Sequence, residues 1–114
     1  ESDIITLHIA LNDETRNFIS AKEIELMKPS AVIINAARGP IINTKDLANA
    51  LKNGQIFVSA FDVFDTEPPL DKNNPLLNLP NTILMPHVGF ATKEAFEQRL
   101  EIVIKNVERF VNKA

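Results

Sequence analysis

The sequence predicts an α/β protein in which an open, doubly wound parallel sheet carries helices on its faces and a long helix follows at the carboxyl end. Two observations predict this class. Short runs of β-branched and other apolar residues recur along the chain, and they alternate with segments that have helix caps and helical spacing. Such alternation is typical of parallel strands joined by right-handed crossovers.

The first strand and the first helix are marked by composition and by a capping signal. Residues 3–9 are rich in β-branched side chains and too few for a typical helix, so they predict a strand that is largely buried on both faces. Ser20 and Glu23 form the Ser-x-x-Glu pattern of a capping box, and Ile24 and Met27 follow at helical spacing before a proline. A short helix is therefore expected after the first strand.

A second strand and helix repeat this arrangement. Residues 31–36 are apolar and β-branched, which predicts another buried strand. Thr44 offers an N-cap for a helix over residues 45–53, and Gly54 stands where such a helix is expected to stop. The alternation of strand and helix thus continues.

Two further strands complete the predicted sheet. Residues 56–62 and 82–85 are each apolar enough to lie inside a covered sheet. The segment between them contains four prolines, too many interruptions for a long helix, and it is unusually long for a connection without structure. Because long ordered loops often carry function, this segment is a candidate for part of a site.

A last helix is expected from Thr92 onward, over residues 93–114. Its apolar side chains recur at steps of four and three, which gives one continuous stripe that needs a partner surface. Two partners remain open, namely the sheet itself and a second domain or subunit. The stripe consists of Phe96, Leu100, Val103, Val107 and Phe110, and Ile104 and Val111 widen it.

Composition excludes several classes of function. The 114 residues contain no cysteine, which removes thiol nucleophiles, disulfides and thiolate metal sites, and we expect no metal centre and a reducing, cytoplasmic location. A net charge of -3 without a basic cluster argues against nucleic acid or an anionic membrane surface as partner. No apolar run approaches the roughly 20 residues needed to span a bilayer. The expected partner is a small molecule.

The chain opens at Glu1 without a methionine and runs almost at once into a strand-like segment. We therefore expect it to be a piece of a longer protein.

Polar side chains gather where the predicted strands end. Ligands of open parallel sheets bind beyond the carboxyl ends of the strands, so residues that follow different strands should share one cleft. His8 follows the first strand and Arg38 the second, Asp62 and Glu67 follow the third, and His87 follows the fourth. An imidazole, a carboxylate and a guanidinium in one cleft suit the reduction of a 2-oxo acid.

Three of these residues have distinct chemical tasks in this hypothesis. His87 can donate a proton to a carbonyl oxygen, and the carboxylate of Glu67 would favour the charged imidazolium and orient it. Arg38 stays cationic and presents a planar fork that matches a substrate carboxylate. These three are the candidate catalytic residues.

Simpler roles stand beside each assignment. Arg38 could be a solvated turn residue, Glu67 could solvate its loop, and His87 could be a structural histidine. Asp62 is as well explained by a turn or cap as by a site. For His8 we favour a buried histidine that bonds to the backbone over a role in binding.

Three segments resemble the signatures of one known family. They read Asn-Ala-Ala-Arg-Gly at 35–39, Phe-Asp-Val-Phe-Asp-Thr-Glu-Pro at 61–68 and Pro-His-Val-Gly at 86–89, and together they resemble the D-isomer-specific 2-hydroxyacid dehydrogenases. The resemblance covers essentially the whole chain. It implies that residues 1–92 are the later half of an NAD-binding Rossmann domain, followed by the carboxyl-terminal helix over 93–114.

The resemblance also implies site residues and a cofactor. Arg38 would bind the substrate carboxylate and carbonyl, His87 would be the general acid and base, and Glu67 would hold His87. NAD is the family's usual cofactor, with NADP not excluded, and Asp62 would meet its carboxamide. The residues placed beside the cofactor are Ala36, Ala37, Arg38, Asp62, His87, Gly89 and His8.

The chain departs from the family pattern in two places. His8 is followed by Ile9 and Ala10, where the family commonly has a proline two residues after the histidine, and this weakens a cofactor contact by His8. No Gly-x-Gly-x-x-Gly loop occurs among only three glycines. This chain alone is therefore expected to be inactive.

The leading hypothesis is an NAD-dependent oxidoreductase that interconverts small 2-oxo acids and D-2-hydroxy acids, with a hydroxypyruvate- or glycerate-like substrate as one option. The longer protein is expected to form a homo-oligomer, with a homodimer as the specific expectation. The alternative is a noncatalytic NAD-binding or protein-interaction module on the same scaffold.

Overall fold

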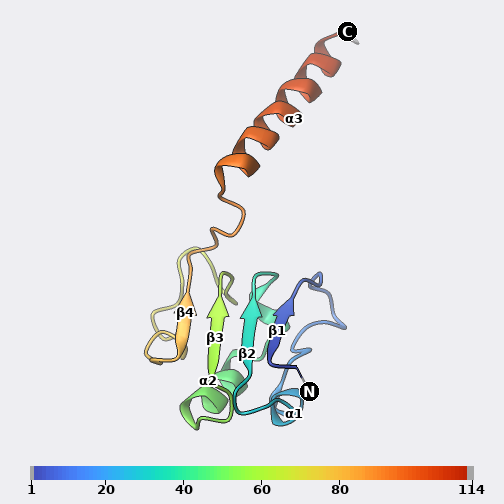
Figure 1. Ribbon diagram of the computed structural model, residues 1–114. Helices are drawn as coiled ribbons and strands as arrows, with labels where there is room; N and C mark the ends of the chain where they lie inside the picture. The colour runs from blue at the N-terminus through green and yellow to red at the C-terminus, as the bar shows by residue number, and fades with distance from the viewer. Residues whose placement is uncertain (1, 113–114) are drawn as a thin grey trace.

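The computed structural model describes residues 2–112, which form a four-stranded sheet, three α-helices and one short 3-10 helix. The sheet order is β1-β2-β3-β4 and all three pairings are parallel, as Figure 1 shows. This confirms the predicted fold class. The elements are β1 (Ile4–Leu7), α1 (Ala21–Glu25), β2 (Val32–Asn35), η1 (Gly39–Ile41), α2 (Thr44–Lys52), β3 (Val58–Phe61), β4 (Thr82–Leu84) and α3 (Lys93–Val111).

Every strand is shorter than its apolar run. The sequence predicted a first strand over residues 3–9, for example, whereas β1 has only four residues. The sheet pairing of β1 with β2 extends from Ile4 to Leu7, and His8 and Ile9 have already left it. Strand ends depend on pairing with a neighbour, which composition does not reveal.

The core lies between one face of the sheet and the helices α1 and α2, which pack against each other. Ile33 and Phe61 point from the sheet into this core, where they join Ile24 of α1 and Leu47 of α2. All four side chains are almost fully buried, and burying one such side chain typically contributes about 1.5–3 kcal/mol.

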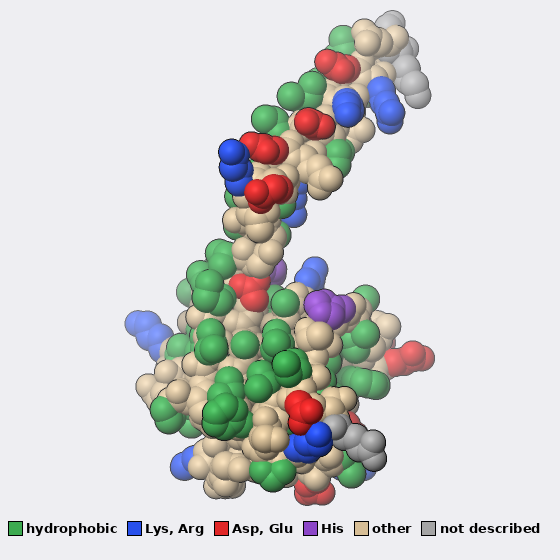
Figure 2. All heavy atoms as spheres, in the orientation of Figure 1, with side chains coloured by type: hydrophobic (Ala, Val, Ile, Leu, Met, Phe, Trp, Pro, Cys, Tyr) green, Lys and Arg blue, Asp and Glu red, His purple; other side chains and the backbone are tan. Residues whose placement is uncertain are grey.

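The opposite face of the sheet is partly open. Ile4 is 63% exposed and Ile83 is 58% exposed, and the side chains of β2 and β3 on this face are only half-buried. Apolar side chains gather over the sheet in the view of Figure 2. The expectation that the first strand is largely buried on both faces was therefore wrong, because α1 and α2 cover only one of them.

Helix starts agree with the sequence in one case and differ in another. The carboxylate of Glu23 accepts hydrogen bonds from the backbone N–H and the hydroxyl of Ser20, as the capping box predicts. The N-cap of α2 is Asn43 and not Thr44, because the Asn43 side chain accepts from two backbone N–H groups. The hydroxyl of Thr44 instead donates a hydrogen bond to Oδ2 of Asp65, 2.7 Å away. Gly54, with φ of 68°, follows the end of α2 as predicted.

The long connection from β3 to β4 is ordered, although it contains no helix or strand. Leu76 from this connection is fully buried in the core, and the Thr82 hydroxyl donates to the carbonyl groups of Leu76 and Leu79. These contacts fix the second half of the connection, next to β4.

Helix α3 begins after Thr92, whose hydroxyl accepts the N–H of Ala95, and it runs away from the sheet (Figure 1). None of its residues is buried, and the described chain is correspondingly elongated, at 61 × 27 × 25 Å. Its apolar stripe does not pack on the sheet, which removes the first of the two partners that the sequence left open. Among residues 2–112, no helix is both long enough and apolar enough to cross a bilayer.

Candidate active site

The candidate site forms where the four strands end together. Leu7, Asn35, Phe61 and Leu84 are aligned side by side in the register of the sheet. The segments that follow these residues therefore emerge at one edge, where ligands of open parallel sheets bind.

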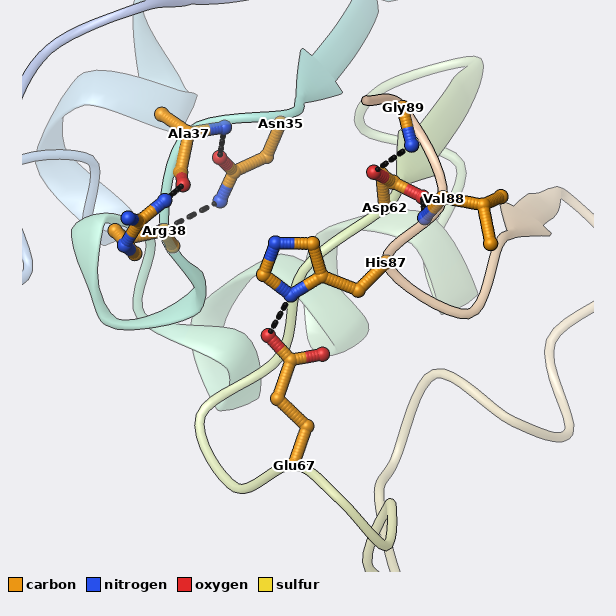
Figure 3. Close-up of polar contacts among 8 residues, drawn as sticks. All are labelled: Asn35, Ala37, Arg38, Asp62, Glu67, His87, Val88 and Gly89. Carbon is orange, nitrogen blue, oxygen red and sulfur yellow. Dashed lines mark hydrogen bonds and ion pairs between the residues drawn. The ribbon is translucent and has the colours of Figure 1, made fainter. Parts of the chain in front are cut away.

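Glu67 and His87 form the closest pair of titratable groups at this edge. Oε1 of Glu67 lies 2.7 Å from Nδ1 of His87, and the two side chains are 22% and 43% exposed. Because an ionised carboxylate can only accept, Nδ1 carries the hydrogen of this bond. Within residues 2–112 no protein group bonds to Nε2, so this nitrogen is available to a ligand. Figure 3 shows the imidazole directed towards Glu67.

The backbone that presents His87 has an unusual conformation. His87 has φ of 55°, in the left-handed region that non-glycine residues rarely adopt. The carboxylate of Asp62 accepts the N–H groups of Val88 and Gly89 at 2.8 and 2.7 Å, and these two bonds hold the turn (Figure 3). Asp62 therefore has the structural role that the sequence weighed against a cofactor contact, and that role leaves its further lone pairs free.

Arg38 lies apart from this pair, on the loop that follows β2. Its guanidinium is exposed and donates from Nη1 to the carbonyl of Ala37 at 2.6 Å (Figure 3). Asn35, which is fully buried, bonds to the backbone of both Ala37 and Arg38. The structure thus pairs two of the three candidate catalytic residues and places the third on a neighbouring loop.

Arg38 and the pair of Glu67 and His87 line two different hollows. One of about 620 Å³ is open and has Arg38 in its wall, together with His8 and the small residues Ala36 and Ala37. The other, of about 440 Å³, is apolar and has Glu67 and His87 in its wall. The side chains that complete the apolar wall are Phe64, Pro68, Leu70, Leu77, Leu84, Met85 and Pro86.

His8 differs from its expected role. The sequence favoured a buried histidine bonded to the backbone, but His8 is exposed and its Nε2 lies 2.9 Å from the hydroxyl of Thr6. The prediction was wrong because His8 lies beyond the end of β1, which is an edge strand with a neighbour on one side only.

Three residues near the site, Phe90, Arg99 and Asn35, were not proposed from the sequence as site residues. Phe90 packs edge-on against the ring of His87, with 6.2 Å between the ring centroids. The guanidinium carbon of Arg99 lies 4.9 Å from the centroid of the Phe90 ring. Asn35 had one usable signal, since it is a polar residue at the end of an otherwise apolar run. Among the described residues, no cluster of three or more histidine or acidic side chains could hold a metal ion.

The fold and site define a class of protein, a Rossmann-like α/β domain with a paired histidine and carboxylate at its strand ends. Residues 1–89 match the family described as "D-isomer specific 2-hydroxyacid dehydrogenase, NAD binding domain". The chain belongs to this family of NAD-dependent oxidoreductases.

Curated relatives support the assignment. Glyoxylate reductase of Thermococcus litoralis is 46% identical over 110 residues, which are 96% of this chain and 33% of the relative. Glycerate dehydrogenase of Methylorubrum extorquens is 45% identical over 114 residues, 97% of this chain and 36% of the relative. The chain therefore spans about a third of the length of these relatives.

Solved structures have the same fold. The NAD-complexed D-isomer specific 2-hydroxyacid dehydrogenase of Lactobacillus delbrueckii ssp. bulgaricus matches with a TM-score of 0.86 at 28% identity, over 100% of this chain and 38% of the other. An acyclic imino acid reductase in complex with NADPH and D-Arg matches with a TM-score of 0.85 at 35% identity, over 98% and 35%. Both structures extend well beyond the matched segment.

Proposed function

We propose that the complete protein interconverts small 2-oxo acids and D-2-hydroxy acids with a nicotinamide cofactor. The observation that carries this proposal is the bond between Glu67 and His87, which leaves Nε2 of the imidazole free at the strand ends. A proton donor at this place suits a carbonyl oxygen that gains a proton as the carbon is reduced. Family membership agrees with this chemistry.

In this mechanism the imidazole moves the proton. His87 donates from Nε2 to the carbonyl oxygen during reduction and takes the proton back during oxidation. Glu67 holds Nδ1, so that the ring keeps one orientation and its positive form is balanced by a neighbouring carboxylate. Asp62 helps to position the same imidazole, because its carboxylate holds the turn that follows His87.

Arg38 anchors the substrate in this proposal. A guanidinium can bind a carboxylate through two parallel hydrogen bonds and so orient the adjacent carbonyl. Its present bond to the carbonyl of Ala37 lies within its own loop, and the side chain is exposed. Rotation of the side chain alone can therefore turn the guanidinium towards a substrate that lies near His87.

The residues of the Arg38 loop fit the nicotinamide end of the cofactor, which supplies or accepts the hydride when bound. The hollow of about 620 Å³ lies at the carboxyl ends of the strands, and Ala36 and Ala37 leave room there for a flat ring. We propose that these alanines and Arg38 line the cofactor site, with His8 and Gly89 at its margins. Asp62 can still accept from a carboxamide through the lone pairs that the turn leaves free. We propose NAD as the cofactor, and a comparison of NADH with NADPH at equal concentration tests this choice.

The domain organisation is proposed from the same grounds. Residues 1–92 would be the later part of the nucleotide-binding domain, and the helix from residue 93 onward would pack on a further domain. The exposed apolar stripe of α3 supports this, since such surface is costly in water.

We also propose a cytoplasmic homodimer that acts on small 2-oxo acids and binds neither nucleic acid nor membrane.

One pair of substitutions tests the function in the full-length protein. His87→Ala should lower kcat about 10²–10⁴-fold, which is the usual contribution of a positioned acid or base, while binding of NADH is retained. Glu67→Gln should lower kcat less, and Asp71→Asn, an exposed carboxylate on the same connection, serves as the matched control. Unchanged turnover in His87→Ala would remove His87 from the proposal, whereas no turnover in the full-length wild type would favour the noncatalytic module.

A further inference from the structure

The side chain of Asn35 bonds to the backbone of the loop that carries Arg38. Asn35 is the last residue of β2 and is fully buried. Its Oδ1 accepts the N–H of Ala37 at 3.1 Å, and its Nδ2 donates to the carbonyl of Arg38 at 2.9 Å (Figure 3). One carboxamide therefore satisfies a donor and an acceptor on successive residues.

This task requires a particular residue type. Beyond Asn35 the chain leaves the ladder between β2 and β3, so the next backbone groups lose their partners in the sheet. Buried backbone groups without partners are costly, and a carboxamide supplies both a donor and an acceptor. Aspartate has nearly the same shape, but its ionised form cannot donate to the carbonyl of Arg38.

The rest of the Arg38 loop is also tightly fixed. A β-carbon on Gly39 would overlap the backbone of Phe64, so this glycine allows the loop to lie directly against the segment that leads to Glu67. On the other side, the N–H of Asn17 donates to the carbonyl of Pro40 at 2.8 Å. The backbone carbonyl of Asn35 accepts the N–H of Asp62 at 3.0 Å. These contacts therefore fix the backbone of Arg38 relative to β3.

We propose that Asn35 is a positioning residue for Arg38. Its carboxamide holds the backbone from which the guanidinium reaches the substrate carboxylate. Its backbone carbonyl accepts the N–H of Asp62, whose carboxylate holds the turn after His87. The inference rests on the proposed function, in which Arg38 is the anchor. In this inference a buried residue that cannot itself touch the substrate affects substrate binding indirectly, through the position of Arg38.

The test compares two matched substitutions in the full-length protein. Asn35→Asp removes the donor to Arg38, whereas Asn81→Asp removes similar donors to the carbonyl groups of Leu51 and Phe57, near the other ends of the strands. Misplacement by about 1 Å can cost about 10²-fold, so Asn35→Asp should raise KM for the 2-oxo acid about tenfold or more. Asn81→Asp should leave KM unchanged, with a smaller loss of melting temperature because Asn81 is only half-buried whereas Asn35 is fully buried. Equal KM values in the two variants would overturn the inference.

A double-substitution cycle separates this inference from the proposed function. Arg38→Ala should lower kcat/KM strongly, and Asn35→Asp should then add little to it, because both changes act on one group. If Arg38→Ala has no effect, the proposed anchor itself is wrong. If Arg38→Ala is damaging and Asn35→Asp adds its full effect, only the positioning role fails. Asn35→Ser, whose single shorter hydroxyl cannot reproduce both carboxamide bonds and which buries no charge, provides the same cycle should Asn35→Asp fail to fold.

Discussion

The carboxylate of Asp62 and the backbone of Gly89 approach so closely that a β-carbon at position 89 would force one of them to shift. Oδ2 of Asp62 accepts the N–H of Gly89 at 2.7 Å, and a β-carbon on Gly89 would lie 2.8 Å from the same oxygen. His87 stands two residues earlier, in a left-handed conformation. The position of this imidazole therefore depends on a residue that has no side chain and contributes only its backbone N–H.

Replacement of Gly89 by alanine should impair turnover more than stability. The new methyl group must displace Asp62 or the turn, and a shift of about 1 Å at the reacting group can lower the rate about 10²-fold. We expect kcat of the full-length protein to fall while its melting temperature changes little.

Gly54→Ala is the matched control for this change. Gly54 has φ of 68° but open space around it, so alanine there should destabilise α2 by about 1 kcal/mol and leave kcat unchanged. Loss of turnover in both variants, or in neither, would contradict the proposed link between Gly89 and His87.

Substitution of Arg38 by lysine should weaken substrate binding. A lysine offers a point charge where the guanidinium offers a fork, and one lost charge-assisted bond of about 1.5–3 kcal/mol corresponds to roughly 10- to 100-fold. KM for the 2-oxo acid should rise by this factor in steady-state kinetics. Arg109→Lys, on the exposed helix α3, should behave like the wild type. Normal KM in Arg38→Lys would argue against a forked contact.

The start of α2 can be tested through its cap. Asn43→Ala removes an acceptor from the N–H groups of Lys45 and Asp46, which should lower the free energy of unfolding by about 1 kcal/mol. Urea unfolding followed by circular dichroism measures this loss. Thr44→Ala should leave the helix cap intact, because its hydroxyl bonds to Asp65. A larger loss in Thr44→Ala would mean that threonine is the cap after all.

The capping box of α1 should make stability depend on pH. Hydrogen bonds from the hydroxyl and backbone of Ser20 hold the pKa of Glu23 below its ordinary value of 4.5. A lowered pKa in the folded state stabilises the protein above pH 4.5, and this contribution is lost as the pH falls through the lowered value. Glu23→Gln should therefore be less stable than the wild type at neutral pH, with a difference that narrows in acid. Urea midpoints at several pH values measure this difference, and Glu25→Gln, at an exposed position of the same helix, is the matched control.

Much of the fold follows from local patterns in the sequence. The four strands are visible because each is a short β-branched run, and the pairing of Ser20 with Glu23 needs only residues of one helical turn. The candidate residues Glu67 and His87 were found because each follows a strand, and a parallel sheet brings such ends to one edge. These features depend on contacts between near neighbours or on the general geometry of the fold.

Other features depend on contacts between distant segments. Thr44 does not cap α2, because its hydroxyl donates a hydrogen bond to Asp65, which is distant in the chain. His8 is exposed because β1 lies at the edge of the sheet, and α3 projects from the sheet although its stripe is apolar. The sequence by itself determined the class of fold and the groups available for chemistry. Only the tertiary structure decided which of these groups meet, because pairing, burial and competition for hydrogen bonds are set by residues that are distant in the chain.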